Sequence, residues 1–239
     1  MSSSLKLIEL NAVPIEEQLK IEEALLRLTD DNYCIINDGS IPSIIMGISG
    51  KVDELVNKPL INASPIPLLK RYSGGGTVVD DHNTLFVSFI FEKKAHDFPC
   101  FPERILKWTE SFYKEALQID GFSLRENDYV IGDLKCGGNA QYIQKNRFVH
   151  HTTFLWDYDP QNMEYLLHPK KAPKYRQDRL HDEFLCRLKD FLPSKKSFIS
   201  KVKETLKEKY DMKATSLNPL IPLLSTPHRK GTSNIALPI

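Results

Sequence analysis

The sequence is poor in cysteine and contains no long apolar run. Its 239 residues include four cysteines and no Cys-x-x-Cys pair, so neither a disulfide framework nor a cysteine-rich zinc site is expected. No run approaches the roughly 20 apolar residues of a membrane helix, and the N-terminus lacks the apolar block of a secretory signal. Acidic residues precede the first arginine, Arg27, which argues against a transit peptide. We expect a globular, cytoplasmic protein that does not enter a membrane.

The sequence also lacks a net excess of either charge, but its charged residues are unevenly distributed. The formal net charge is +1, whereas residues 165–239 carry sixteen Lys/Arg against seven Asp/Glu. This basic part suits a negatively charged partner. The lysines at 201–213 are explained equally well as residues on the solvated face of a helix. Aromatic residues do not alternate with the charges, so a nucleic-acid surface is not expected.

Short β-rich runs and amphipathic helices alternate along the chain. Turns rich in Asn, Asp, Gly and Pro separate the runs. The predicted strands lie at 33–36, 44–48, 68–72, 77–79, 85–91, 129–131, 140–143 and 148–156. The predicted helices lie at 15–28, 103–117, 181–192 and 195–210, and the proline-containing tail from 219 to 239 is expected to be irregular. This order predicts an α+β fold with a mixed β-sheet flanked by helices.

Three consecutive glycines follow a fixed cation near residue 71. The segment 70–79 reads Lys-Arg-Tyr-Ser-Gly-Gly-Gly-Thr-Val-Val. Glycine is normally avoided beside strands unless another group must approach the main chain closely. A tight turn between two strands is the simpler explanation, but a loop that grips a phosphate or carboxylate fits the full pattern better. The commoner Gly-x-x-x-x-Gly-Lys-Ser/Thr and Gly-x-Gly-x-x-Gly motifs are absent.

A second small-residue segment surrounds a lone lysine. Lys135 begins Lys-Cys-Gly-Gly-Asn-Ala-Gln, Asn127-Asp128 precede it, and His151 follows. A lysine in this setting can reach a phosphate or carboxylate oxygen while the glycines keep the site open. It could equally be a solvent-facing lysine before a Gly-Gly bulge. A lone strand histidine such as His151 is more often structural, and His150 must face the other way, so the two are not expected to chelate one metal.

Together these segments resemble the lipoate-protein ligase family, within the biotin/lipoate ligase fold group. The family pattern Arg-Arg-x-Ser-Gly-Gly-Gly-(Ala/Thr)-Val is similar to 70–78, and Lys-x-x-Gly-(Ser/Asn)-Ala-Gln is similar to 135–141. An Asn-Asp pair and a His-x-Thr-x-Leu strand match 127–128 and 151–155. The resemblance covers roughly residues 5–190. It implies a biotin/lipoate ligase-like catalytic domain at 1–192, followed at 193–239 by a short basic helical extension with an irregular tail.

The resemblance implies a two-step reaction. Lipoate and ATP, assisted by Mg²⁺, would give lipoyl-adenylate and pyrophosphate, and the lipoyl group would then pass to a lysine of an acidic lipoyl domain, such as an E2 subunit or the glycine cleavage H protein. The implied catalytic cations are Arg71 and Lys135. The implied substrate and nucleotide contacts are Ser73, Gly74, Gly75, Gly76, Thr77, Asn83, Asn127, Asp128, Gly138, Ala140, His151 and Thr153, with Asp128 also a possible Mg²⁺ contact. Val78, Phe86 and Val149 are guesses for the apolar slot that lipoate needs.

The chain departs from the family pattern in three places. It has Asp-Asp-His-Asn at 80–83 where His-Asp-x-Gly-Asn is usual, and His-Thr-Thr at 151–153 where His-Gly-Thr is usual. It also has only some fifty residues after 190, fewer than the separate accessory domain of known ligases. Either the basic part at 195–239 is a reduced substitute for that domain, or adenylation needs a partner polypeptide.

Other functions compete with a ligase. An octanoyl- or lipoyl-transferase of the same fold would take a carrier-bound acyl group, sometimes through an activated cysteine. The stretch 120–134 contains no cysteine, and we interpret Cys136 as structural. Octanoyltransferases and amidotransferases that use a lysine stay open as the alternative. A biotin ligase lacks support because Gly-Arg-Gly-Arg is missing. A non-catalytic lipoate carrier would not need both Arg71 and Lys135.

Overall fold

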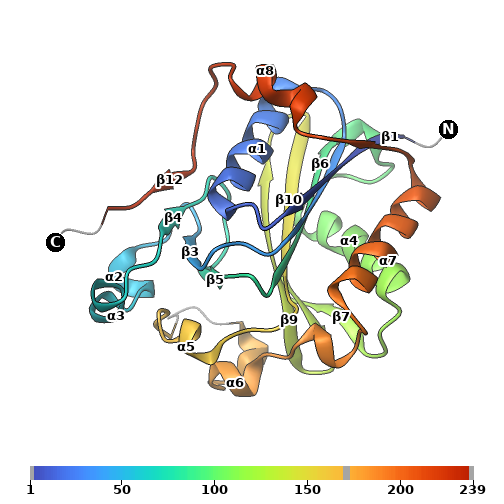
Figure 1. The fold of residues 1–239 in the computed structure, drawn as a ribbon. Helices are drawn as coiled ribbons and strands as arrows, with labels where there is room; N and C mark the ends of the chain where they lie inside the picture. The colour runs from blue at the N-terminus through green and yellow to red at the C-terminus, as the bar shows by residue number, and fades with distance from the viewer. Residues whose placement is uncertain (1–2, 169–172, 237–239) are drawn as a thin grey trace.

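Two β-sheets and the helices that cover them form the protein. The computed structural model describes residues 3–168 and 173–236 (Figure 1). The larger sheet has eight strands in the order β11-β1-β2-β6-β10-β9-β8-β7, and the smaller has four in the order β12-β4-β3-β5. β1 runs parallel to β2 and β11, whereas the remaining pairs of the larger sheet are antiparallel. The predicted mixed sheet is confirmed.

The strands of the larger sheet are β1 (Ser4–Asn11), β2 (Tyr33–Asp38), β6 (Thr84–Glu92), β7 (Phe122–Arg125), β8 (Asp128–Ile131), β9 (Leu134–Ile143), β10 (Arg147–Leu155) and β11 (Asp211–Thr215). Those of the smaller sheet are β3 (Ser43–Met46), β4 (Leu68–Lys70), β5 (Val78–Asp80) and β12 (Ser233–Asn234). The α-helices are α1 (Ile15–Leu28), α2 (Val52–Leu55), α3 (Lys58–Ala63), α4 (Pro102–Leu117), α5 (Pro160–Met163), α6 (His181–Phe184), α7 (Lys195–Lys209) and α8 (Ile221–Leu224).

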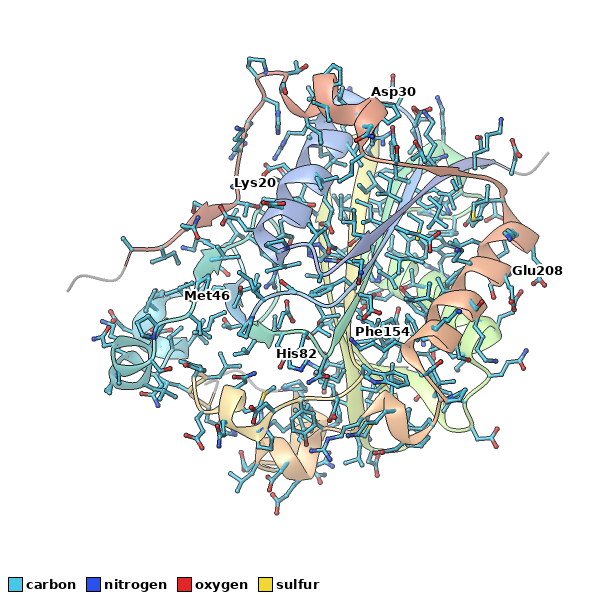
Figure 2. The ribbon with its side chains drawn as sticks, viewed as in Figure 1. Lys20, Asp30, Met46, His82, Phe154 and Glu208 are labelled. Carbon is cyan, nitrogen blue, oxygen red and sulfur yellow. The ribbon has the colours of Figure 1, made fainter. Side chains whose placement is uncertain are left out.

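Helices cover both faces of the larger sheet. α4 and α7 pack on one face around an aromatic core that includes Phe89, Phe112, Phe154 and Phe198. Figure 2 shows Phe154 inside this layer and Glu208 on the outer side of α7. α1 covers the other face and, through Leu25 and its neighbours, also packs against the smaller sheet. Strand β6 is therefore buried along nearly its whole length. None of the helices within 3–168 and 173–236 is long and apolar enough to cross a membrane.

Two sequence predictions of secondary structure were wrong. The helix predicted at 181–192 ends after Phe184, because Leu185 pairs with Lys135 and the Cys186 N–H bonds to the Lys135 carbonyl at 2.9 Å. The tail predicted to be irregular forms α8 and β12 within its described part. There the Gly231 N–H donates to both carboxylate oxygens of Glu23, at 2.9 and 2.8 Å.

The C-terminal segment 193–239 joins the rest of the fold at several points. α7 packs on α4, β11 pairs with β1, and β12 pairs with β4. Its separation from 1–192 as a distinct extension stays a prediction. Residues 237–239 of this segment lie outside the described ranges.

Candidate functional site

A cleft of about 1040 Å³ lies between the smaller sheet and the larger one. The three glycines of 74–76 form part of one wall, and β9 with the Asn127-Asp128 turn forms another. The start of α1 and the segments that contain α5 and α6 complete the lining. A cleft of this size can hold a ligand larger than a typical drug molecule. The two segments singled out in the sequence thus face one cavity.

Arg71 holds the glycine segment in place through hydrogen bonds. It is 6% exposed, and its Nη2 donates to the carbonyls of Gly74 and Gly76 at 2.7 and 2.9 Å. Its Nε donates to the Ser73 hydroxyl at 3.1 Å, and its Nη1 donates to the Ile45 carbonyl. Burial lowers the pKa of this guanidinium to about 10. The predicted contact between Arg71 and a phosphate stays a prediction, since here its donors hold the loop.

The three glycines at 74–76 differ in whether the fold itself could accommodate a side chain. Gly75 has φ +102°, and a Cβ there would lie 2.7 Å from Arg71 Nη2. Neither Gly74 nor Gly76 has a positive φ, and a Cβ at either would meet no described atom within 4 Å. Folding therefore requires glycine only at Gly75. At the other two positions, the space that a side chain would fill belongs to the cleft, as expected where a ligand approaches the main chain.

The glycine segment and β9 come close together at Ala140. A Cβ on Gly75 would lie 3.3 Å from the Ala140 Cβ and 3.6 Å from the Asn139 carbonyl oxygen. A side chain at 75 would therefore crowd Ala140. The small residues of the second segment therefore let the two walls meet around one site.

Lys135 projects into the cleft from β9. Its Nζ lies 2.9 Å from Asp128 Oδ1, and the Tyr175 hydroxyl donates to Asp128 Oδ2 at 2.9 Å. The pairing of β8 with β9 slips at Cys136, because Val130 faces Lys135 while Tyr129 faces Gly137. This bulge places Lys135 on the same face as Gly138, whose Cβ would lie 3.3 Å from the ammonium. The lysine is a cation held in place by one carboxylate.

His151 belongs to a buried hydrogen-bond chain under the glycine loop. Its Nδ1 lies 2.9 Å from Glu22 Oε2, and its Nε2 lies 2.8 Å from the Ser73 hydroxyl. Glu22 is fully buried and also accepts from Ser88 and Gln18. Burial alone would raise the pKa of Glu22, but His151 and the hydroxyl and amide donors outweigh it and lower that pKa. The chain fixes the histidine ring and ties α1 to the loop.

The remaining predicted residues fall into two groups. Those that line the cleft are Thr77, Asn127, Gly138, Ala140 and Thr153, together with Val78 and Phe86 of the guessed apolar slot. Ser73 is fully buried and supports the loop rather than the cleft surface. Asn83 and Val149 do not line the cleft. The Asn83 carbonyl instead accepts the Trp156 N–H, and Val149 packs in the core under α1.

Glu22 and Asp80 escaped the sequence analysis, although both are buried and line the cavity. Arg176, counted in the basic C-terminal part of the sequence, is also buried and lines the cavity. Burial raises the pKa of Asp80 to about 7, despite the attraction of Arg71. A buried carboxylate within an amphipathic helix, as at Glu22, was a visible signal, but its partner lies 129 residues away. Gly47 also escaped notice, although a side chain there would collide with the Gly75 carbonyl.

The possible metal ligands of the cleft are dispersed. In the described part of the chain, no three His, Cys, Asp or Glu side chains converge on one point. Both oxygens of Asp128 already accept a hydrogen bond or ion pair. The described residues therefore do not form a dedicated cage for a metal ion.

Cys136 offers no activated thiolate. It is fully buried, its thiol donates to the Tyr129 carbonyl at 3.4 Å, and burial raises its pKa well above the usual range. The other cysteines are also buried. This environment disfavours a cysteine nucleophile at the lysine motif.

Comparison with known proteins gives consistent results. The model of the lipoyl protein ligase A/B catalytic domain matches residues 14–211. A Plasmodium falciparum protein named inactive lipoate–protein ligase 2 is 31% identical over 245 residues, which cover 76% of this chain and 62% of that protein. Lipoate–protein ligase 1 of Staphylococcus aureus is 34% identical over 120 residues, covering 49% of this chain and 35% of that protein. The matched part thus spans less than two thirds of either relative's length.

One solved structure shares the fold closely. It is described as a bi-partite lipoate protein ligase and its E2 lipoyl domain from Thermoplasma acidophilum. The TM-score is 0.71 at 20% identity, and the match covers 90% of this chain and 86% of that chain. At this identity the likeness establishes the fold, with its mixed sheets and flanking helices.

Proposed function

Because this chain belongs to the lipoyl protein ligase A/B catalytic domain family, we propose that it activates lipoate with MgATP and transfers the lipoyl group to a lysine of a lipoyl domain. The observation that carries the proposal is the meeting of the two motifs. A Cβ built on Gly75 would lie 3.3 Å from the Ala140 Cβ, so the glycine segment and β9 face each other closely, and Lys135 lines the cleft that they enclose.

The cleft has an apolar end and a polar end. Ile15, Leu19, Val78 and Phe86 contribute apolar side chains from α1 and the two sheets. The polar end contains Asn127, Asp128 and Lys135 with the neighbouring segment at 173–185. We assign the apolar end to the acyl chain and dithiolane of lipoate, and the polar end to the nucleotide.

The first step needs charge stabilisation rather than a base. The lipoate carboxylate is already ionised at neutral pH, so its oxygen attacks the α-phosphorus directly and the bond to pyrophosphate breaks. In the transition state, negative charge is spread over the oxygens of the transferred phosphoryl group and of the leaving pyrophosphate. Lys135, positioned by Asp128, neutralises part of it, and main-chain N–H groups at 74–76 can donate to the same oxygens or to the acyl carbonyl.

The second step transfers the acyl group. The acceptor lysine attacks the carbonyl carbon of the mixed anhydride as a neutral amine, and AMP leaves with the bonding electron pair. The lysine nitrogen then loses its extra proton. Lys135 can stabilise the departing phosphate, so one residue serves both half-reactions.

The acceptor is proposed to be an acidic lipoyl domain. In the basic stretch 170–179, Lys170 and Lys171 lie outside the described residues and Lys174 is exposed. Arg179 donates to the Tyr175, Arg176 and Asp133 carbonyls. Lys174 is therefore the described lysine of this stretch that is available for docking. A partner polypeptide, as in the bi-partite archaeal system, stays part of the proposal.

The test combines the purified chain with MgATP, lipoate and an isolated lipoyl domain. Mass spectrometry should show one lipoyl group on the acceptor lysine, dependent on both ATP and lipoate. A parallel reaction replaces both with octanoyl carrier protein. Modification only in this second reaction would assign the chain to the transferases. No modification in either, with or without an added accessory polypeptide, would place it with the relative named inactive.

A further inference from the structure

Arg176 lines the cleft and carries a buried donor that has no partner among the described residues. It is 4% exposed, lines the cavity, and its Nη2 has no hydrogen-bond partner in the described structure. Its Nε donates to the Arg179 carbonyl at 2.9 Å, and its guanidinium lies 5.0 Å from the centre of the Phe184 ring. Burial lowers its pKa from the usual range. A buried guanidinium group with one unpartnered nitrogen and no counter-charge carries a desolvation cost that a bound anion would reduce.

The segment that carries Arg176 is fastened to the strands around Lys135. The Tyr175 hydroxyl bonds to Asp128, which also holds the Lys135 ammonium. Ten residues further on, Leu185 pairs with Lys135 itself, and Arg179 Nη2 donates to the Asp133 carbonyl at 3.1 Å. Arg176 is thus delivered to the polar end of the cleft. Its position is set by the same carboxylate that positions Lys135.

The contacts of Arg71 and Arg176 are opposite in kind. Arg71 donates to three groups of the glycine loop, among them the Gly74 and Gly76 carbonyls, and to the Ile45 carbonyl of β3. Arg176 forms no ion pair with any described residue, and its buried Nη2 is unbonded. The planar guanidinium matches two oxygens of a phosphate, a geometry that a lysine cannot reproduce.

We infer that Arg176 is the anion-binding arginine of this cleft and that its ligand is a phosphate group of the nucleotide, beside Lys135. The inference rests on the proposed function for the identity of that nucleotide. It assigns the guanidinium to the phosphate at the polar end rather than to the lipoate carboxylate at the border of the apolar end.

The experiment measures binding of MgATP and of lipoate separately by calorimetry. Arg176→Gln should weaken MgATP binding by on the order of tenfold to a hundredfold, the effect of losing a charge-assisted hydrogen bond. Lipoate binding should stay within about twofold. Arg176→Lys should recover only part of the loss, because a lysine keeps the charge but not the planar fork. Arg229→Gln, which makes the same change at an exposed arginine that does not line the cleft, is the matched control and should bind MgATP like the wild type.

Each result decides the matter. Equal MgATP binding by wild type and Arg176→Gln overturns the inference, as does a wild-type chain that binds no MgATP. A parallel loss of lipoate and MgATP binding, with a lowered melting temperature, would mean that Arg176 only packs against Phe184. If MgATP binding depends on Arg176 but no lipoyl-adenylate forms, the inference stands and the proposed function fails.

Discussion

Replacement of Lys135 by alanine should lower the catalytic rate far more than the stability of the protein. The ammonium lies 2.9 Å from Asp128, and the two side chains are 21% and 10% exposed. Exposed ion pairs contribute about 0.2–1 kcal/mol and breaking a buried pair costs about 3–5 kcal/mol. For this half-buried pair we expect a loss of about 1–2 kcal/mol, because Asp128 keeps the Tyr175 hydroxyl as a partner. The folded state should remain the dominant one.

The effect on catalysis should be much larger. Removal of one preorganised donor to transition-state charge typically lowers kcat by about 10²–10³, or roughly 3–4 kcal/mol. We therefore expect Lys135→Ala to reduce lipoate-dependent AMP formation at saturating substrates by at least on the order of a hundredfold. Unfolding in urea should show the smaller loss estimated above.

Lys189→Ala is the control for loss of a lysine from an ion pair. Its ammonium lies 2.5 Å from Asp157, and it does not line the cleft. This variant should keep its activity. A folded Lys135→Ala protein with more than about a third of wild-type activity would refute the role given to Lys135.

Three further predictions concern the loop, the buried chain and docking. Gly74→Ala and Gly76→Ala should keep the melting temperature of the wild type but lose substrate binding measured by calorimetry. Gly75→Ala should instead lower the melting temperature. Equal destabilisation by all three would show that the loop is built for folding alone. Glu22→Gln should destabilise the protein by about 3–5 kcal/mol near neutral pH. The lowered pKa of Glu22 contributes stability that is present above the unfolded value of 4.5 and lost as pH falls through the folded pKa. The difference from wild type in denaturant titrations should therefore shrink below pH 4.5, and a constant difference would contradict this. Lys174→Glu should slow lipoyl transfer to an acidic domain and reduce its salt dependence in stopped-flow assays, while adenylation is unchanged; equal slowing of both steps would exclude a docking role.

The sequence predicted the main elements because their signals are local. Alternation and helical periodicity placed α1, β6, α4 and β10 close to their observed bounds. The helix at 181–192 failed for a non-local reason, since the pairing of Leu185 with Lys135 draws the chain away from helical geometry. The order in the tail also depends on a distant partner, the Glu23 carboxylate.

In the candidate site, too, the features with local signals could be predicted and those with distant partners could not. Glycine at 74–76 and the lysine at 135 could be recognised because small residues beside a cation are unusual in any sheet. The donors of Arg71 could not be assigned from sequence, because they bond to carbonyls that the loop turns inward. Arg176 was counted only as one of the basic residues of 165–239, but its contact with Phe184 and the Tyr175–Asp128 hydrogen bond place it at the cleft. Charge counts reveal which residues are cationic and not which of them are buried.

The most direct test of acyl-adenylate formation is pyrophosphate exchange. The isolated chain is incubated with ATP, Mg²⁺, labelled pyrophosphate and lipoate, without any acceptor protein. A cleft that joins the lipoate carboxylate to the α-phosphate predicts label in ATP only when lipoate is present, and at least on the order of a hundredfold less with Lys135→Ala. Exchange that is absent, or that is independent of lipoate, would contradict adenylation by this chain alone.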